Sequence, residues 1–310
     1  MVFAKEGRHG MKHLLFILLA TTLHAAPRAL DMVIVVGAPG TEEYGKKFTA
    51  QVNAWTTACA RAGIAPEIYR GEKTTAELEQ RLSKSKPDRS LWLVLIGHGT
   101  FDGREAKFSA EGPDFDAKQL SDWLKPLKQE IAIIHTASSS GGFLKSLSGK
   151  SRIVITSTKS PDEVFYARFG EHFAEAIGGL MDADLDQDKQ VSLLEAFRHA
   201  SKSAATFYEN EGRLATEHAL IEDNGDGVGT RYEMIEGAAD GERARQMVLV
   251  LSEEEQKLTD AQRNTRDGLE RDLKLLKEQR EKLSDDEYYT KLEALMRKLG
   301  EVYGSSRPTT

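Results

Sequence analysis

The chain has 310 residues, of which 40% are hydrophobic and 29% are charged. Its 42 basic and 49 acidic residues give a net charge of −7, which argues against a nucleic-acid-binding protein, since such proteins normally present a basic face. The single cysteine excludes a disulfide framework and a cysteine-rich zinc module. No apolar stretch reaches the roughly 18 residues that a membrane-spanning helix needs. We therefore expect a globular protein with no membrane span and no nucleic-acid partner.

The first 25 residues have the pattern of a secretory signal peptide. Lys12 precedes an apolar run from Leu14 to Leu23, and the small residues Ala25 and Ala26 follow. A basic start, a short apolar segment and a small-residue end are the features of such signals. Residues 1–10 do not fit a signal peptide, so Met11 is the expected true start, and an N-terminal core helix is the alternative interpretation. The pattern predicts export to the periplasm or the exterior, where calcium is available.

Short apolar runs then alternate with helical patterns. Strands are predicted at Asp31–Val36, Pro66–Tyr69, Leu91–Ile96, Ile131–Ile134 and Arg152–Thr156. Because strands that alternate with helices form parallel sheets covered on both faces, we expect a three-layer α/β sandwich with a mainly parallel sheet over residues 29–240. Cys59 lies on the apolar stripe of the first helix and is predicted to be buried and unreactive. A helix capped by Ser160–Glu163 is predicted after the last strand.

The character of the chain changes over residues 250–304, which are rich in charge and contain no proline. Leu269, Leu273 and Leu276 follow one helix face. Ser284–Glu287 has the spacing of a capping box and opens a second helix with apolar residues from Tyr289 to Leu299. We predict a helical hairpin or an antiparallel coiled coil, with an ordinary pair of packed helices as the alternative. The hairpin would serve self-association or partner binding, and residues 305–310 would be a disordered tail.

Two of the predicted strands end in residues that can carry chemistry. His98 and Gly99 follow Leu91–Ile96, and Ser138 follows Ile131–Ile134 about forty residues later. Ligands of such sheets bind beyond the carboxyl ends of the strands. The order and spacing resemble the caspase, legumain and gingipain group of cysteine peptidases. The legumain branch is the most similar because a small-residue turn, Ser140-Gly141, follows.

The resemblance implies a caspase-like fold over roughly Asp31 to Met234 and a cleft for a peptide or protein ligand. It also implies that His98 is the acid/base and that the amides of Gly99 and Ser138 form an oxyanion hole. The family's nucleophilic cysteine falls on Ser138. A thiol with a pKa of about 8.5 supplies some thiolate at neutral pH, whereas a hydroxyl needs a tightly placed base, usually oriented by a carboxylate.

Two functional hypotheses follow from this substitution. In the first, the chain is a pseudo-peptidase that binds a peptide or protein. In the second, it is an active hydrolase that uses Ser138 with His98, oriented by a carboxylate from Asp102, Glu105 or Asp114. His135 precedes Ser138 by three residues and is a further candidate for the same crevice. In the simplest alternative, His98 holds a loop and residues 138–140 form a polar turn or a helix N-cap.

Residues 184–195 fit the twelve-residue calcium loop of the EF-hand. Acidic ligands stand at positions 1, 3 and 5, a carbonyl at position 7 and a glutamate at position 12, namely Asp184, Asp186, Asp188, Gln190 and Glu195. Position 6 is Lys189, where the sharp turn normally requires glycine. The alternative is a solvated acidic loop in which Ser192 and Glu195 form a capping box, and the two interpretations are compatible.

A weaker second calcium loop is predicted from Glu222, Asn224, Asp226 and Glu233. A tight turn through Asp223–Gly227 is the alternative. Calcium is the only cofactor predicted.

The segment Gly40–Lys46 matches the start of a phosphate-binding loop, but Lys47 takes the place of the magnesium ligand, so no nucleotide is expected. The histidines lack zinc spacing. A third functional hypothesis, which rests on the predicted calcium loops, is a calcium-stabilised structural protein.

Overall fold

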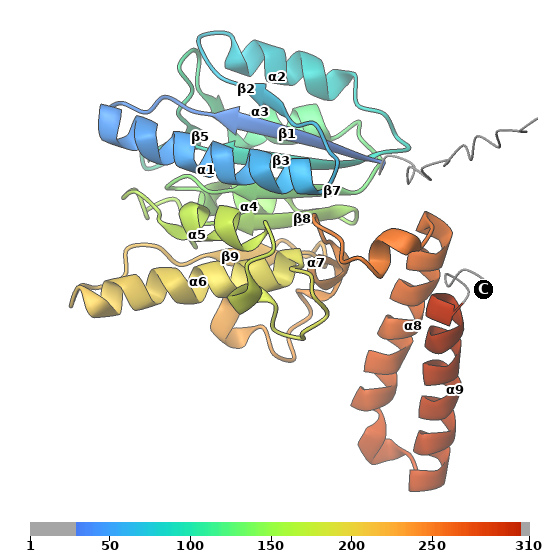
Figure 1. Cartoon of the computed structure of the whole chain (residues 1–310). Helices are drawn as coiled ribbons and strands as arrows, with labels where there is room; N and C mark the ends of the chain where they lie inside the picture. Colours follow the sequence, from blue (N-terminus) through green and yellow to red (C-terminus); the bar gives the residue numbers. More distant parts are fainter. Residues whose placement is uncertain (1–28, 305–310) are drawn as a thin grey trace, which may run out of the picture.

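A six-stranded sheet forms the centre of the computed structural model, which describes residues 29–304 (Figure 1). The predicted signal peptide and the predicted tail at 305–310 lie outside the described residues. The strands, in their order across the sheet, are β2 (Glu67–Tyr69), β1 (Leu30–Val36), β3 (Ser90–Ile96), β7 (Ile131–His135), β8 (Arg152–Thr156) and β9 (Leu220–Glu222). Neighbouring strands are parallel except β9, which runs antiparallel to β8. The mainly parallel sheet is confirmed.

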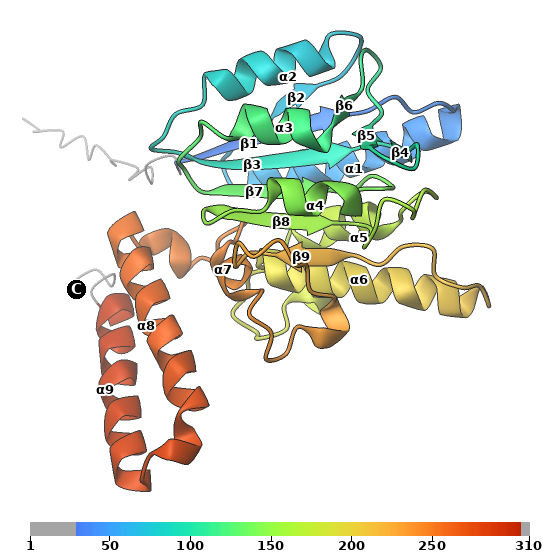
Figure 2. The same cartoon turned by 180° about the vertical axis from the view of Figure 1, so that it is seen from behind.

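Helices cover both faces of the sheet, which makes the predicted three layers (Figures 1 and 2). One face packs against α1 (Glu42–Arg61), α5 (Phe169–Ala176) and α6 (Leu193–Asn210). The other packs against α2 (Thr74–Ser83), α3 (Ala117–Leu124) and α4 (Gly141–Leu147). Successive strand residues point to opposite faces, so two separate cores form.

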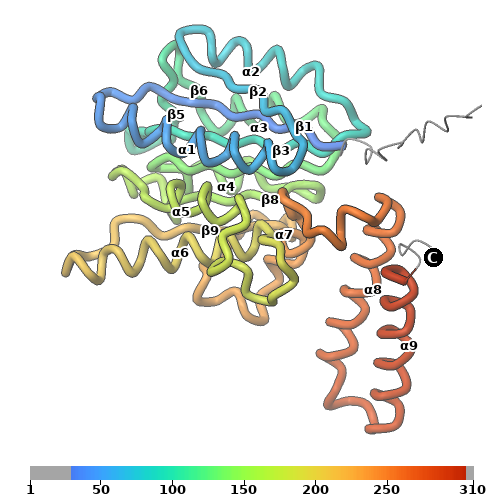
Figure 3. The backbone as a smooth tube through the Cα atoms, viewed as in Figure 1, coloured from blue at the N-terminus to red at the C-terminus, as the bar shows by residue number. Residues whose placement is uncertain are grey.

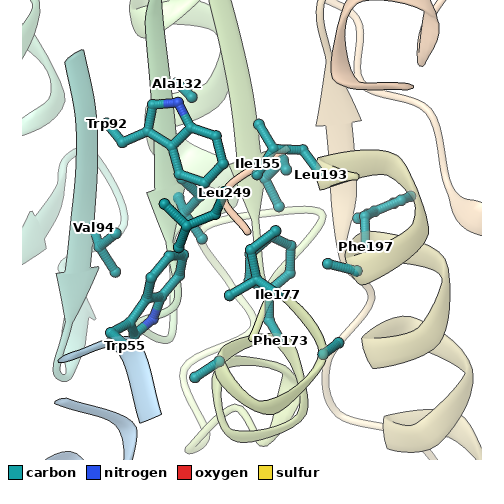
Figure 4. Close-up of a cluster of buried hydrophobic side chains, with 14 of the residues drawn as sticks. Trp55, Trp92, Val94, Ala132, Ile155, Phe173, Ile177, Leu193, Phe197 and Leu249 are labelled. Atoms are coloured by element: carbon teal, nitrogen blue, oxygen red, sulfur yellow. The ribbon is translucent and has the colours of Figure 1, made fainter. Parts of the chain in front are cut away.

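The first core joins the sheet to the helices of one face. Figure 4 shows Trp55 of α1 and Phe173 of α5 close to Val94 and Ile155 of the sheet. Both aromatic side chains are fully buried. Cys59, on the same stripe of α1, is also fully buried, and burial raises the pKa of its thiol to about 11. The predicted burial of this thiol is confirmed.

A small antiparallel sheet follows β3 directly and was not predicted. It consists of β4 (Gly99–Phe101), β5 (Ala106–Phe108) and β6 (Phe115–Asp116). Its strands have two or three residues each, too few to show an alternating pattern in the sequence. Because β4 begins at Gly99, this sheet holds the segment that follows His98.

The C-terminal hairpin consists of α8 (Asp260–Glu278) and α9 (Asp285–Gly304), which pack antiparallel to each other (Figure 3). It joins the α/β domain through α7 (Glu242–Gln246), where Gln246 bonds to the Asp267 carbonyl and to Arg271. In both cartoon views α8 lies nearer the domain than α9. No helix among residues 29–304 is long and apolar enough to cross a membrane.

Candidate active site

His98 lies between the end of β3 and the start of β4, and a main-chain carbonyl orients it. Its Nε2 is 3.3 Å from the carbonyl oxygen of Pro39. A carbonyl can only accept a hydrogen bond, so Nε2 carries the proton and Nδ1 of the neutral ring is unprotonated. The rings of Tyr44 and Phe48 lie 4.6 and 5.1 Å from the His98 ring. Burial lowers the pKa of His98, although its hydrogen bond to Pro39 opposes this, so the imidazole is neutral at pH 7.

Ser138 is buried, and its hydroxyl is bonded to the backbone of Gly99 in both directions. Its Oγ accepts from the Gly99 amide at 3.0 Å and donates to the Gly99 carbonyl at 3.0 Å. A Cβ at position 99 would lie 2.0 Å from the Ser138 carbonyl oxygen, so glycine is required for this approach. Among the hydrogen bonds of residues 29–304, none joins His98 to Ser138.

The turn after Ser138 is held against the loop that follows β8. Ser139 adopts a left-handed backbone with φ of 56°, and its amide donates to the Glu163 carbonyl at 2.8 Å. The Ser140 hydroxyl lies 3.1 Å from that of Ser157. The α4 helix begins at Gly141, whose amide donates to the Thr158 hydroxyl at 2.8 Å, and the Ser140 side chain makes no capping hydrogen bond. The turn is therefore positioned by tertiary contacts and not by helix capping.

The segment between β8 and α5 is a loop, where a helix was predicted from Ser160. The helix expected from Ser160 begins only at Phe169. Glu163 instead forms a hydrogen bond with His218, with Oε1 2.5 Å from Nδ1. The loop exposes two apolar side chains beside the site, Val164 at 47% and Phe165 at 65%.

His135 does not face the crevice. It is fully buried, its ring packs 4.5 Å from that of Phe143 and 5.8 Å from that of Phe108, and both ring nitrogens lack a hydrogen-bond partner within the described chain. Burial lowers its pKa to about 3. Because β7 extends one residue further than predicted, the alternation of the strand directs His135 into the core.

None of the three predicted orienting carboxylates contacts His98. Asp102 accepts from the amides of Arg104 and Glu105 in an exposed turn, Glu105 lies beside Lys107, and Asp114 accepts from the Ala110 amide. The carbonyl of Pro39 takes the orienting role instead. A main-chain group leaves no side-chain signature, so sequence reasoning had no signal with which to find it.

The predicted calcium loop brings three carboxylates together. One oxygen from each of Asp184, Asp186 and Asp188 lies within 4.8 Å of the others. Oδ1 of Asp184 is buried and has no hydrogen-bond partner within the described chain. Lys189 adopts a left-handed backbone with φ of 68°, so the loop makes its turn without glycine. These features fit a divalent cation with oxygen ligands.

The last position of the loop has a different role. Glu195 accepts from the amides of Leu185 and Asp186 and from the Ser192 amide and hydroxyl. It forms the predicted capping box with Ser192 at the start of α6. Gln190, at position 7, has its side-chain amide bonded to Asp188 and accepts from the Ser252 amide.

The weaker second loop does not bring its predicted ligands together. Glu222 is fully buried at the end of β9 and accepts from the Gly225 amide. Glu233 binds Arg231 at 2.5 Å instead of turning toward the loop. Asn224 and Asp226 bond to each other across the turn. The tight-turn alternative describes this segment.

A comparison with protein-family profiles identifies the family of the chain. The profile of the Peptidase C13 family matches residues 59–220, more than half of the chain, and the chain belongs to that family. Comparison with curated protein sequences found no match. The predicted resemblance to the legumain-like peptidases is therefore confirmed.

Two solved structures are among those similar to the chain. The Drosophila initiator caspase Dronc is 11% identical, with a TM-score of 0.41, and the match covers 76% of this chain and 97% of that one. Caspase-1 from Spodoptera frugiperda is also 11% identical, with a TM-score of 0.41, and the match covers 64% of this chain and 87% of that one.

Proposed function

We propose that the protein is an exported pseudo-peptidase that binds a peptide or protein segment beside His98 and Ser138 without hydrolysing it. The observation that carries this proposal is the double hydrogen bond between the Ser138 hydroxyl and the Gly99 backbone. The hydroxyl proton is donated to a carbonyl and not to a base. The Gly99 amide, expected to stabilise an oxyanion, is already bonded to the hydroxyl.

This arrangement opposes two requirements of acyl transfer, namely activation of the serine nucleophile and stabilisation of the oxyanion. A serine nucleophile needs its proton directed at a base that can remove it. An oxyanion hole needs preorganised donors that are open to the developing charge, and the loss of one such donor costs about 10²–10³ in kcat. To react, Ser138 would have to break two buried hydrogen bonds before attacking a substrate. We therefore infer that the site binds a peptide but does not hydrolyse it.

The surroundings of the site support ligand binding. Val164 and Phe165 present apolar surface one and two residues after Glu163, whose carbonyl holds the Ser139 amide. On the other side of His98, the rings of Tyr44 and Phe48 of α1 form an aromatic wall. An extended peptide with an apolar side chain suits such a surface, since ligand sites combine apolar walls with a few polar groups.

The alternative function is an active hydrolase that uses Ser138 with His98. One observation favours it: the Nε2–H of His98 is held by Pro39, which leaves a neutral ring with an unprotonated Nδ1. Such a ring is competent as a general base. This alternative requires the Ser138 hydroxyl to rotate away from Gly99.

Hydrolysis of a mixed peptide library separates the two functions. Wild type, Ser138→Ala and Ser138→Cys are compared, with His98→Ala added to the cysteine variant as its background control. We expect cleavage only by Ser138→Cys, because a thiolate does not need the hydroxyl's base. Cleavage by wild type that is lost in Ser138→Ala would establish the active hydrolase.

A binding assay tests the other half of the proposal. Peptides that Ser138→Cys cleaves are labelled and titrated with Ser138→Ala, and fluorescence polarisation reports binding. We expect binding that weakens about tenfold in Phe165→Ser and is unchanged in Phe207→Ser, since the Phe207 ring belongs to α6 and is covered by Arg168. If neither wild type nor Ser138→Ala binds any peptide, the pseudo-peptidase proposal is wrong.

Calcium binding at residues 184–195 is the second part of the proposal. The support is the gathering of Asp184, Asp186 and Asp188 and the buried, unpartnered Oδ1 of Asp184. We expect calcium to raise the melting temperature relative to a chelator. Asp188→Asn should abolish the rise, and Asp226→Asn in the second loop should keep it. Identical melting with calcium and with chelator would remove calcium from the proposal and leave the peptide site untouched.

A further inference from the structure

The loop of residues 184–195 lies against the segment that joins the α/β domain to the C-terminal hairpin. This segment, which we call the linker, comprises residues 247–259 between the end of α7 and the start of α8. Ser192 of the loop pairs with Val248 of the linker in an antiparallel bridge. The end of the loop and the beginning of the linker are therefore fixed to each other through their backbones.

A buried glutamine connects the carboxylates of this loop to the middle of the linker. Gln190 is 4% exposed. Its Nε2 donates to Oδ2 of Asp188 at 2.9 Å, and its Oε1 accepts from the Ser252 amide at 3.1 Å. One end of the carboxamide is thus bonded to a proposed calcium ligand and the other end to the linker backbone. A shift of the Asp188 carboxylate therefore moves the group that holds Ser252.

The linker in turn holds both helices of the hairpin. The Ser252 hydroxyl accepts from the Glu255 amide at 3.4 Å. The Glu255 carboxylate pairs with Arg266 of α8 and accepts from the Tyr303 hydroxyl of α9. Ser252, Glu255 and Arg266 are each at most 8% exposed. A continuous series of buried polar contacts therefore runs from Gln190 to the base of the hairpin.

Negative charge gathers on both sides of this junction. One oxygen from each of Asp184, Asp186 and Asp188 lies within 4.8 Å of the others. On the hairpin side, burial raises the pKa of Glu270 of α8, Arg266 opposes this, and nearby carboxylates, Asp188 among them, raise it further. The loop and α8 therefore repel each other. A divalent cation bound by the three aspartates cancels two of their negative charges and weakens this repulsion.

We propose that calcium bound by residues 184–195 fixes the hairpin to the α/β domain, and that Gln190 transmits the effect to the linker. This inference rests on the calcium site of the proposed function. Attachments between α7 and α8 are weaker, such as the ion pair of Lys274 with Glu242, whose side chains are 41% and 33% exposed. Because such exposed pairs contribute little stability, the buried contacts of the linker determine how firmly the hairpin is held.

The position of the hairpin makes this coupling consequential. In both cartoon views the hairpin projects away from the α/β domain (Figures 1 and 2). Its first helix, α8, has 19 residues and is about 28 Å long at a rise of 1.5 Å per residue. A small rotation at the linker therefore displaces the far end of the hairpin by a much larger distance. Calcium would thus set the direction in which the hairpin points.

The coupling must act in both directions. A ligand shifts an equilibrium only by its differential affinity for the two states. If calcium strengthens the attachment of the hairpin by some factor, then the attached hairpin strengthens calcium binding by the same factor. We expect a factor of about five, the order of magnitude that a net hydrogen bond contributes.

Hydrogen exchange of the full chain with calcium and with chelator tests the inference. We expect calcium to slow exchange about fivefold in residues 247–266, in addition to its effect on residues 184–195. Protection confined to residues 184–195 overturns the coupling and leaves the calcium site intact. No protection in either segment removes the calcium site itself, and the coupling with it, so the two failures are distinguishable.

Gln190→Ala separates transmission from binding. The ligand at this position of the loop is the main-chain carbonyl, so the variant should still bind calcium in a calorimetric titration, about fivefold more weakly because the coupling is lost. It should also lose the calcium-dependent protection of residues 247–266. Gln187→Ala, an exposed position of the same loop, is the matched control and should behave as wild type. Linker protection that persists in Gln190→Ala contradicts the role of Gln190.

A distance measurement provides a second readout that does not need Gln190→Ala to be stable. Spin labels are placed at Thr206→Cys on α6 and Met296→Cys on α9, both exposed positions, and the native Cys59 is fully buried. Calcium should narrow the distribution of distances between the two labels. Equal distributions with calcium and with chelator, in protein that binds calcium by titration, overturn the inference. Neither readout depends on peptide binding or hydrolysis.

Discussion

At the scale of single residues, the Ser138 hydroxyl links the turn after β7 to the start of β4. It satisfies both polar groups of Gly99, whose backbone is buried against it. The adjacent Ser139 is equally buried, but its hydroxyl has no hydrogen-bond partner within residues 29–304. Two neighbouring serines therefore have opposite energetic roles, and the difference is measurable.

We predict that Ser138→Ala lowers the free energy of unfolding by about 1–2 kcal/mol, because buried groups lose their hydrogen-bond partner. Ser139→Ala should instead raise it by up to about 1 kcal/mol, since it removes a buried hydroxyl that has no hydrogen-bond partner. Urea unfolding of the two variants provides the measurement. Equal effects would mean that the bonds to Gly99 contribute no net stability.

His135 predicts how stability depends on pH. Its pKa is about 3 in the folded protein and about 6.5 when unfolded, so below pH 6.5 only the unfolded state gains the proton. Stability is therefore lost as the pH falls, by about 1.4 kcal/mol per pH unit, or about 2 kcal/mol between pH 6.5 and 5. His135→Leu should flatten the pH profile by this amount. His199→Gln on α6 is the control, and a wild-type slope in His135→Leu would refute the argument.

At the scale of elements, the loop of residues 184–195 has a strained backbone at Lys189. Lys189 occupies the position where glycine is usual, and its φ is 68°. A left-handed backbone costs a residue with a Cβ roughly 1–2 kcal/mol. The Lys189 side chain contributes little stability to offset this cost, because its ion pair with Glu254 at 3.3 Å is exposed.

Lys189→Gly should therefore raise the free energy of unfolding by about 1 kcal/mol. Lys189→Ala is the matched control, since it loses the same ion pair but keeps the Cβ. Thermal unfolding with chelator present isolates the backbone effect from any metal. A gain in both variants, or in neither, would show that the strain is not released at this position.

At the scale of the whole molecule, the base of the hairpin depends on one buried ion pair. Arg266 of α8 lies 2.5 Å from Glu255, and both side chains are at most 10% exposed. The Tyr303 hydroxyl of α9 donates to the same carboxylate at 2.7 Å. Glu255 therefore ties both helices to the segment that leads to α7.

Arg266→Met should destabilise the protein by about 3 kcal/mol, because it leaves a buried carboxylate without its cation. Arg297→Met removes an exposed pair within α9 and should cost no more than about 0.5 kcal/mol. Hydrogen exchange should show the loss of protection concentrated in α8 and α9. Protection equal in the two variants would mean that the buried pair does not hold the hairpin.

The sequence by itself was sufficient for the parts of the structure that depend on local pattern. Runs such as Leu91–Ile96 predict buried strands because their period and apolar content are local properties, and the five predicted strands agree with β1, β2, β3, β7 and β8 within one or two residues. The His-Gly and Ala-Ser strand ends predicted the family for the same reason. The gathering of the three aspartates follows from the spacing of one loop.

Only the tertiary structure decided what those residues do to one another. His98 and Ser138 lie at neighbouring strand ends, yet the hydroxyl bonds to Gly99 and the imidazole to Pro39, which is 59 residues away in the chain. The strand β7 extends one residue further than predicted, which places His135 in the core. Glu163 lies in a loop and not in the predicted helix, and its carboxylate bonds to His218. Hydrogen bonds depend on distances of tenths of an ångström between segments that only the folded chain brings together, and no sequence spacing encodes them.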